Sequence, residues 1–112
     1  MSRPRLVEED LQRAREVVRR ELLYQLATKG DHAFVSSHEV LGVVTEEYAE
    51  IEGAVQSNDL IPIMLELRHM AVACLLGLAS IRAKALNWPH APDNIDDAFP
   101  APGKDQALVP AG

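Results

Sequence analysis

The sequence predicts an all-α protein with three helices in one domain. Apolar side chains recur every three or four residues through residues 1–87, which is the period of helices that bury one face. Aromatic residues make up only 4% of the chain and apolar residues 47%, a balance that favours a globular helical chain over a β-sheet protein or a disordered one. A length of 112 residues leaves little room for a second domain.

The first predicted helix is long and runs from about Leu6 to Thr28, with Gly30 ending it. One side of this helix is expected to pack and the other to face solvent, because charged residues separate the apolar ones. The apolar positions with helical spacing are Leu11, Val18, Leu22 and Leu26.

The second predicted helix begins after Ser36. Ser36 and Glu39 have the spacing of a capping box, in which each residue satisfies a backbone N–H at the start of the helix. The polar run 57–59 interrupts the apolar pattern and ends the helix. Its apolar stripe consists of Val40, Val44, Ile51 and Val55.

The third predicted helix runs from about Asp59 to Leu86 and returns antiparallel to the second, because the connection between them is short. Its middle is apolar on nearly every side, and such a helix must be buried on every side. Three helices cannot surround one of their own number. We therefore expect a homodimer or homotetramer, in which copies of the chain complete a helical bundle.

The remaining residues, 88–112, are predicted to form an extended or disordered tail after the helical domain of residues 1–87. Proline sets this stretch apart, since it fixes the backbone in extended or turn conformations. The prolines in the tail are Pro89, Pro92, Pro100, Pro102 and Pro110.

The overall charge and the single cysteine predict a cytoplasmic protein. A net charge of −6 argues against nucleic acid as a partner, because phosphate binding needs a basic face. Cys74 has no intrachain partner and suits a reducing compartment. The first ten residues lack the apolar segment of a secretory signal, and the longest apolar run, 70–79, is about half of a membrane span, so no membrane partner is expected.

Two acidic pairs occupy inward-facing positions. Glu47 lies three residues after Val44, on the apolar stripe of the second helix, and Glu50 follows one turn later. Glu66 and His69 have the same spacing and interrupt the apolar surface of the third helix. Antiparallel packing of the two helices would bring both pairs together.

Buried carboxylates need compensation, because an unpaired one costs several kcal/mol. A solvated acidic face or protonated carboxyl groups would remove the problem, and arginines of the first helix could reach the acids. Arg68 lies off the edge that carries Glu66 and His69. A divalent cation with oxygen ligands, Mg²⁺ or Mn²⁺, is the favoured interpretation.

The run from Ser37 to Glu50, followed by residues 66–69, resembles the MazG-like all-α nucleoside triphosphate pyrophosphohydrolases. That family carries an ExxE pair on one helix and an ExxD pair on the next. Glu47 and Glu50 match the first pair and Glu66 the first acid of the second, whereas His69 stands where the family has aspartate. The resemblance covers residues 36–81, and imidazole is a poorer ligand for Mg²⁺ than carboxylate.

The resemblance implies a helical dimer or dimer of dimers that cleaves a (deoxy)nucleoside triphosphate between its α and β phosphates, releasing monophosphate and pyrophosphate. It implies Mg²⁺ bound by the three matching glutamates, with His69 as a further candidate ligand. Glu46 is the candidate for orienting the attacking water. Phosphate charge needs positive partners, for which the candidates are His38, Arg82 and Lys84, although the last two equally suit a helix end.

Two further interpretations stay open. A glutamate on one helix with Glu-x-x-His on the next is half of a di-iron carboxylate site, which a homodimer would complete. The chain could also be a catalytically silent dimer that binds nucleotides or a protein partner, which the histidine at position 69 favours.

Overall fold

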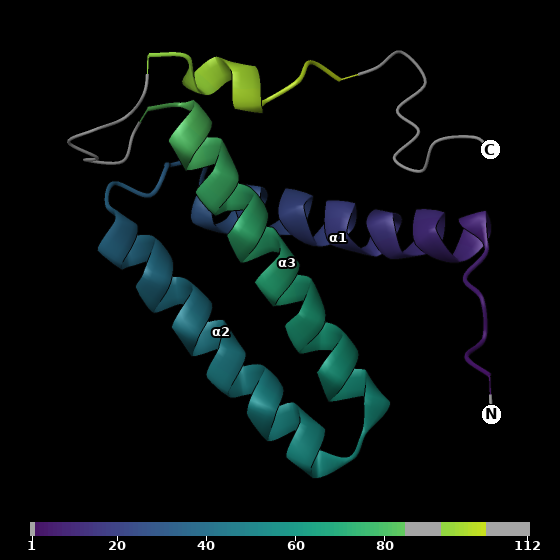
Figure 1. Cartoon of the computed structure of the whole chain (residues 1–112). Coiled ribbons are helices and arrows are strands. Elements are labelled where there is room, and N and C mark those ends of the chain that lie inside the picture. Colours follow the sequence, from purple (N-terminus) through teal and green to yellow (C-terminus); the bar gives the residue numbers. More distant parts are fainter. Residues whose placement is uncertain (1, 85–92, 103–112) are drawn as a thin grey trace.

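The structure, a computed structural model, describes residues 2–84 and 93–102. Within these ranges the chain forms three α-helices and a short 3₁₀ helix, with no strand, which confirms the predicted all-α class. The helices α2 and α3 form an antiparallel hairpin, and α1 lies across it (Figure 1). The elements are α1 (Glu8–Lys29), α2 (Ser37–Ser57), α3 (Leu60–Arg82) and η1 (Ile95–Ala98).

The start of α2 has one of the two contacts that the sequence predicts. Ser36 Oγ accepts a hydrogen bond of 3.0 Å from the backbone N–H of Glu39, and Glu39 Oε1 accepts one of 2.9 Å from the N–H of Val35. The first contact satisfies an N–H of the first turn of α2 that an isolated helix end leaves unpaired. The second differs from the predicted capping box, because Glu39 bonds to Val35, the residue before the N-cap, and not to Ser36. Both contacts fix where α2 begins and therefore which of its residues face α3.

The hairpin turns on two residues. Asn58 adopts a left-handed conformation, with φ 56° and ψ 32°, which asparagine tolerates better than most residues. Asp59 Oδ1 then accepts a hydrogen bond of 3.1 Å from the N–H of Ile61 and caps α3. Because the turn is this short, α3 returns directly along α2, so that the second half of α2 lies beside the first half of α3.

Two helix ends differ from the prediction. The first helix begins at Glu8 and not at Leu6. The N–H of Val7, just before the helix, donates to Asp10 Oδ2 at 3.1 Å. The helix ends before Gly30, as predicted. The third ends at Arg82, short of the predicted Leu86, because Lys84 turns the chain with a positive φ of 58°. Position 86 itself lies outside the described residues.

The predicted tail is only partly described, since residues 88–92 and 103–112 lie outside the described ranges. The described part is not simply extended. It contains η1, whose Asp96 Oδ1 lies 3.1 Å from Arg82 Nη1 at the end of α3. This ion pair is exposed on both sides and contributes little stability.

The interior is small and lies where α3 meets its neighbours. Val72 and Ser80 are fully buried, and at Gly77 an added Cβ would lie 3.4 Å from Val40 Cγ1, so α2 and α3 pack closely there. Ser80 Oγ accepts a hydrogen bond of 2.9 Å from the N–H of Phe34 and donates one of 2.7 Å to the carbonyl of Leu76. The loop before α2 is thus tied to α3.

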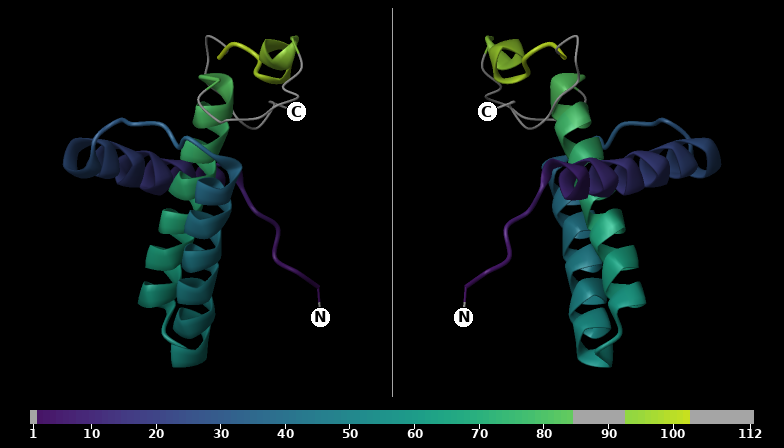
Figure 2. Two further views of the ribbon diagram at one scale, coloured as in Figure 1. Left: turned by 90° about the vertical axis from the view of Figure 1, so that its left-hand side faces the viewer. Right: turned by 90° about the vertical axis from the view of Figure 1, so that its right-hand side faces the viewer.

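A second face of α3 carries apolar side chains that nothing in the described chain covers. Met64, Leu67 and Leu78 are 48%, 54% and 52% exposed. The radius of gyration, 16.4 Å, exceeds the ~13 Å typical of a compact domain of about 100 residues, and Figure 2 shows α1 projecting to one side of the hairpin. This face, the α3 stripe, consists of residues spaced by four and three in turn: Leu60, Met64, Leu67, Ala71, Cys74, Leu78 and Ile81.

By length and composition alone, α3 is also apolar enough to cross a membrane, with 17% of its apolar window buried inside the chain. The core helix of a soluble protein passes the same test. The finding marks α3 as a helix that the rest of the chain leaves largely uncovered.

Replacing Ser80 by alanine should lower the free energy of unfolding by about 1–3 kcal/mol, because the N–H of Phe34 loses its acceptor in a part-buried place. Chemical denaturation at fixed protein concentration measures the difference. Thr28→Ala removes a hydroxyl that donates to the carbonyl of Tyr24 on the exposed side of α1, and should change stability far less. Equal effects of the two substitutions would contradict the role given to Ser80.

Candidate metal centre

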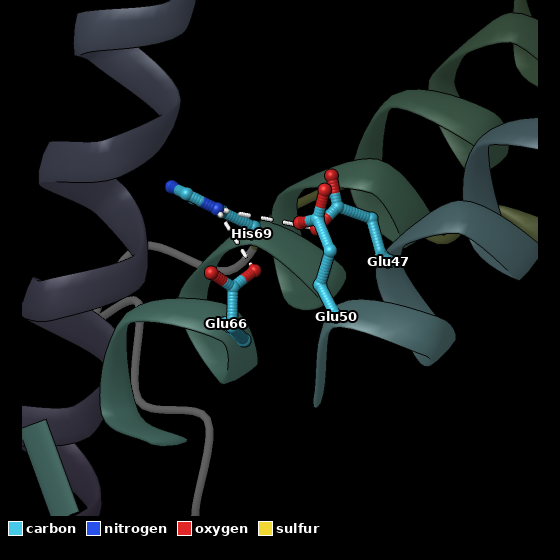
Figure 3. A group of neighbouring side chains, drawn as sticks. All are labelled: Glu47, Glu50, Glu66 and His69. Atoms are coloured by element: carbon cyan, nitrogen blue, oxygen red, sulfur yellow. Dashed lines mark ion pairs between the residues drawn. The ribbon is translucent and has the colours of Figure 1, made fainter. Parts of the chain in front are cut away.

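Four side chains from α2 and α3 point toward one another between the helices (Figure 3). Glu47, Glu50, Glu66 and His69 each offer one ligand atom, and these atoms all lie within 4.8 Å of one another. His69 Nδ1 is 3.4 Å from Glu66 Oε2 and 3.9 Å from Glu47 Oε2. The structure therefore brings together the four residues that the sequence selected as candidate ligands.

Helix geometry explains the convergence. Residues three apart on a helix point from neighbouring places on one face, so each helix supplies two groups on the side that meets the other. The short turn at Asn58 and Asp59 sets α3 antiparallel to α2, so that the two pairs face each other. No loop contributes a ligand atom to this group of four, and the positions of the side chains depend on helix packing alone.

Two carboxylate oxygens of the group have no hydrogen-bond partner. Glu47 Oε2 and Glu66 Oε2 are both shielded from solvent and make no hydrogen bond. The two side chains are 20% and 17% exposed. A buried acceptor without a partner costs about 1–3 kcal/mol, and more when it is charged. A cation bound among the four groups would satisfy both oxygens, so the residues present suit a divalent ion.

Two acids of α2, Glu47 and Glu50, have pKa values above the ordinary glutamate value. Burial raises the pKa of Glu47, and the nearby Glu50 carboxylate raises it further. The Glu66 carboxylate beside Glu50 raises the pKa of Glu50, and desolvation acts in the same direction. Repulsion between the carboxylates is therefore part of the structure of this site when no cation is bound.

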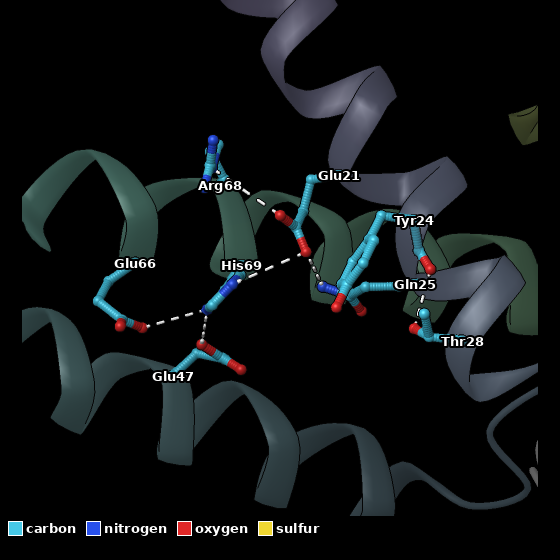
Figure 4. A network of polar contacts seen from close by, with 8 residues as sticks. All are labelled: Glu21, Tyr24, Gln25, Thr28, Glu47, Glu66, Arg68 and His69. Atoms are coloured by element: carbon cyan, nitrogen blue, oxygen red, sulfur yellow. Dashed lines mark hydrogen bonds and ion pairs between the residues drawn. The ribbon is translucent and has the colours of Figure 1, made fainter. Parts of the chain in front are cut away.

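A fifth acid, Glu21 of α1, joins the group from the other side of His69 (Figure 4). Its Oε2 lies 3.7 Å from His69 Nε2, its Oε1 lies 3.9 Å from Arg68 Nε, and its side chain is 10% exposed. Gln25 Nε2 donates to Glu21 Oε2 at 3.0 Å. The sequence analysis missed this residue. The available signal was its place three residues after Val18, beside the apolar stripe of the first helix.

The sequence left open that arginines neutralise the acids of the candidate metal centre, and the structure shows where several of the arginines pair. Arg13 pairs with Glu9, and Arg19 and Arg20 both pair with Glu16, all on exposed parts of α1. Arg68 approaches Glu21 and is the cation nearest to the site in the ion pairs described.

The formal charge of the group suits one divalent ion. Its carboxylates are those of Glu21, Glu47, Glu50 and Glu66, and its cations are Arg68 and, when protonated, His69. These groups sum to −2 with a protonated imidazole and to −3 with a neutral one. A cation of charge +2 would bring the site close to neutrality without any rearrangement of the helices.

The other predicted site residues lie outside this group. Glu46 is exposed on α2, on the side of Gly42 and Gly53, which are also exposed. His38 is exposed in the first turn of α2, nine residues and about 13 Å along the helix axis from Glu47. Arg82 lies 13 residues, about 20 Å, beyond His69 on α3 and pairs with Asp96. Lys84 follows the end of α3 and is exposed.

Comparison of the chain with protein-family models, with curated proteins and with solved structures finds no match. The resemblance to MazG-like pyrophosphohydrolases therefore stays a prediction based on the residues of the two acidic pairs.

The raised pKa values predict that the metal-free protein loses stability as pH rises. Glu47 and Glu50 bind protons more tightly when folded than at the ordinary value of 4.5. Their stabilising contribution is complete below about pH 4.5 and disappears as pH rises through the raised values toward neutrality. Thermal unfolding in the presence of a chelator should give a falling midpoint over this range.

Glu47→Gln should flatten this dependence and raise the midpoint near pH 7, because it removes one repelling charge. A divalent ion should stabilise the protein more at pH 7 than at pH 5. The pKa of Glu16, held at about 2 by Arg19 and Arg20, adds no slope above pH 5. A midpoint that rises from pH 5 to 7 without metal would contradict the repulsion described here.

Proposed function

We propose that this protein is a metal-dependent nucleoside triphosphate pyrophosphohydrolase, which cleaves between the α and β phosphates and releases pyrophosphate. The observation that carries the proposal is the convergence of three carboxylates and His69, with two of the oxygens buried and without a hydrogen bond. The ExxE pair of Glu47 and Glu50 and its spacing to Glu66 support the reaction class through the resemblance to the MazG-like family.

In the proposed enzyme, Glu47, Glu50, Glu66 and His69 hold Mg²⁺ or Mn²⁺. An ion held there would supply positive charge to offset the negative charge that develops on the phosphates as the phosphoanhydride bond breaks. The exposed carboxylate of Glu50 lies at the outer side of the group, where a nucleotide in solvent reaches it first. Glu46, one residue before Glu47 and exposed, remains the candidate for orienting the attacking water.

Arg82 and Lys84, at the C-terminal end of α3, lie far from the candidate metal centre. Arg82 is engaged with Asp96, and about 20 Å of helix separates it from His69. Their positions therefore argue against Arg82 or Lys84 binding a phosphate of a nucleotide that is held at the metal centre of the same copy. Their location suits the negative end of the α3 dipole.

Glu47→Gln and Glu50→Gln should each lower the rate of pyrophosphate release by about 100-fold or more. Each replaces a charged carboxylate ligand by a neutral amide of similar shape. The assay uses a panel of ribo- and deoxyribonucleoside triphosphates with Mg²⁺ and with Mn²⁺. Glu52→Gln, an exposed glutamate of α2 outside the group, is the matched control and should keep the wild-type rate. Circular dichroism should show unchanged helix content.

Other outcomes of this assay decide between the alternatives. Wild-type rates in both variants would remove these carboxylates from the reaction. A wild-type protein without turnover on the whole panel would favour the catalytically silent dimer. Purified protein that is coloured, contains iron and reacts with oxygen would favour the di-iron carboxylate site.

We also propose that a second copy of the chain covers the α3 stripe. Alternating spacings of four and three residues are those of the seam between helices in a coiled coil, which takes another helix as its partner. The same patch on two copies is self-complementary, as a two-fold axis requires. A bilayer is disfavoured because His69 lies on the opposite side of the helix and Glu66 and Arg68 lie on its two flanks.

Sedimentation equilibrium of the full chain at micromolar concentration should give the mass of a dimer or tetramer. Leu67→Glu and Leu78→Glu place charges on the stripe and should give monomers that remain helical. Leu41→Glu, at a residue of α2 that is 63% exposed, is the control and should leave the mass unchanged. A monomeric wild-type protein, or one that floats with phospholipid vesicles, would exclude the second copy as the partner of this face.

A further inference from the structure

The two nitrogens of His69 face carboxylates on opposite sides (Figure 4). Nδ1 faces Glu66 and Glu47 of the candidate metal centre, at 3.4 and 3.9 Å, whereas Nε2 faces Glu21 of α1, at 3.7 Å. A neutral imidazole carries its proton on one nitrogen and a lone pair on the other, and a carboxylate beside one nitrogen favours the proton there. By the same rule Glu66 and Glu47 favour a proton on Nδ1 when no cation is bound. A cation held by these carboxylates would take the Nδ1 lone pair, and Glu21 is then the acceptor that faces the proton left on Nε2.

Glu21 is itself fixed in place. Its side chain is nine-tenths buried, Gln25 Nε2 donates to it at 3.0 Å, and Arg68 Nε lies 3.9 Å away. These contacts come from α1 and α3, so the carboxylate belongs to the packed junction of the two helices and not to a mobile surface. A carboxylate behind a histidine, on the side away from the metal, is the usual means by which proteins orient an imidazole ligand and raise its basicity.

We propose that Glu21 is a positioning residue that holds His69 as a nitrogen ligand, and that the resulting set of three oxygens and one nitrogen prefers Mn²⁺ to Mg²⁺. This inference rests on the proposed metal centre. Imidazole is a favourable ligand for first-row transition metals, whereas Mg²⁺ strongly prefers oxygen. His69 stands where the MazG-like family has aspartate, and Glu21 lies behind it. Together the two residues shift the preference of the site from Mg²⁺ to Mn²⁺.

Isothermal titration of the full chain with Mg²⁺ and with Mn²⁺ tests the preference without any substrate. The wild-type protein should bind Mn²⁺ about tenfold or more tightly than Mg²⁺. Glu21→Gln should weaken Mn²⁺ binding by about 10- to 100-fold, the range found for residues behind metal ligands, and change Mg²⁺ binding much less. His69→Asp should reverse the preference by strengthening Mg²⁺ binding and weakening Mn²⁺ binding.

Two further variants separate positioning from a general effect of charge or of folding. Gln25→Ala removes the hydrogen bond to Glu21 and leaves every charge of the site in place, so it should lower the ratio of Mn²⁺ to Mg²⁺ affinity in the same direction as Glu21→Gln. Glu16→Gln removes an acid of α1 that pairs with Arg19 and Arg20, away from the site, and should leave both affinities unchanged.

The outcomes distinguish this inference from the proposed function. Equal affinity of the wild-type protein for the two ions, or equal weakening of both by Glu21→Gln, would overturn the positioning role while leaving a metal centre in place. An unchanged affinity ratio in His69→Asp would do the same. Failure of the wild-type protein to bind either ion would overturn the inference and the proposed metal centre together.

Discussion

The structure depends on one constraint, which is that carboxylate oxygens are buried between the facing apolar sides of two helices. The hairpin of α2 and α3 gains its stability from packing around Val72 and Gly77. The same packing draws Glu47 and Glu66 out of water and leaves one oxygen of each without a hydrogen-bond partner. A hairpin selected for stability alone would carry apolar residues at these positions, since an ion pair or acid in the core seldom stabilises a fold. The cost therefore indicates a ligand.

The helix that crosses the hairpin, α1, contributes both to packing and to the charge of the candidate metal centre. It packs across α3 and places Glu21 between Arg68 and His69. This carboxylate offsets the guanidinium of Arg68, so that the positive charge is not available to neutralise the three glutamates on the far side of His69. The acids of α2 and α3 consequently keep their mutual repulsion, which appears in the raised pKa of Glu47 and of Glu50. A bound cation relieves a repulsion that α1 helps to preserve.

The part of the structure that was predictable from sequence is the part fixed by local rules. Ser36 and Glu39 are three residues apart, and the Ser36 side chain caps α2 as this spacing predicts. Helical periodicity alone places the two acidic pairs on the facing sides of α2 and α3. Glu21 was not predictable in this way. It lies 48 residues before His69, and the contact depends on how α1 crosses the hairpin. In sequence it follows Arg19 and Arg20 and looks like part of a solvated face. The end of α3 was missed because it depends on the backbone of Lys84.

The two faces of α3 answer different physical demands, and their separation has a consequence for function. His69 lies nearly opposite Leu67 and Leu78 on α3, and Glu66 lies roughly 100–120° around the helix from them, because successive helical residues are about 100° apart. The ligand groups come from α2 and α3 of one copy, and the stripe faces away from them. Covering the stripe therefore stabilises the helix that carries half of the site without supplying a ligand to it. In the proposed dimer each copy would bind metal with its own residues, whereas its stability would depend on what covers its α3.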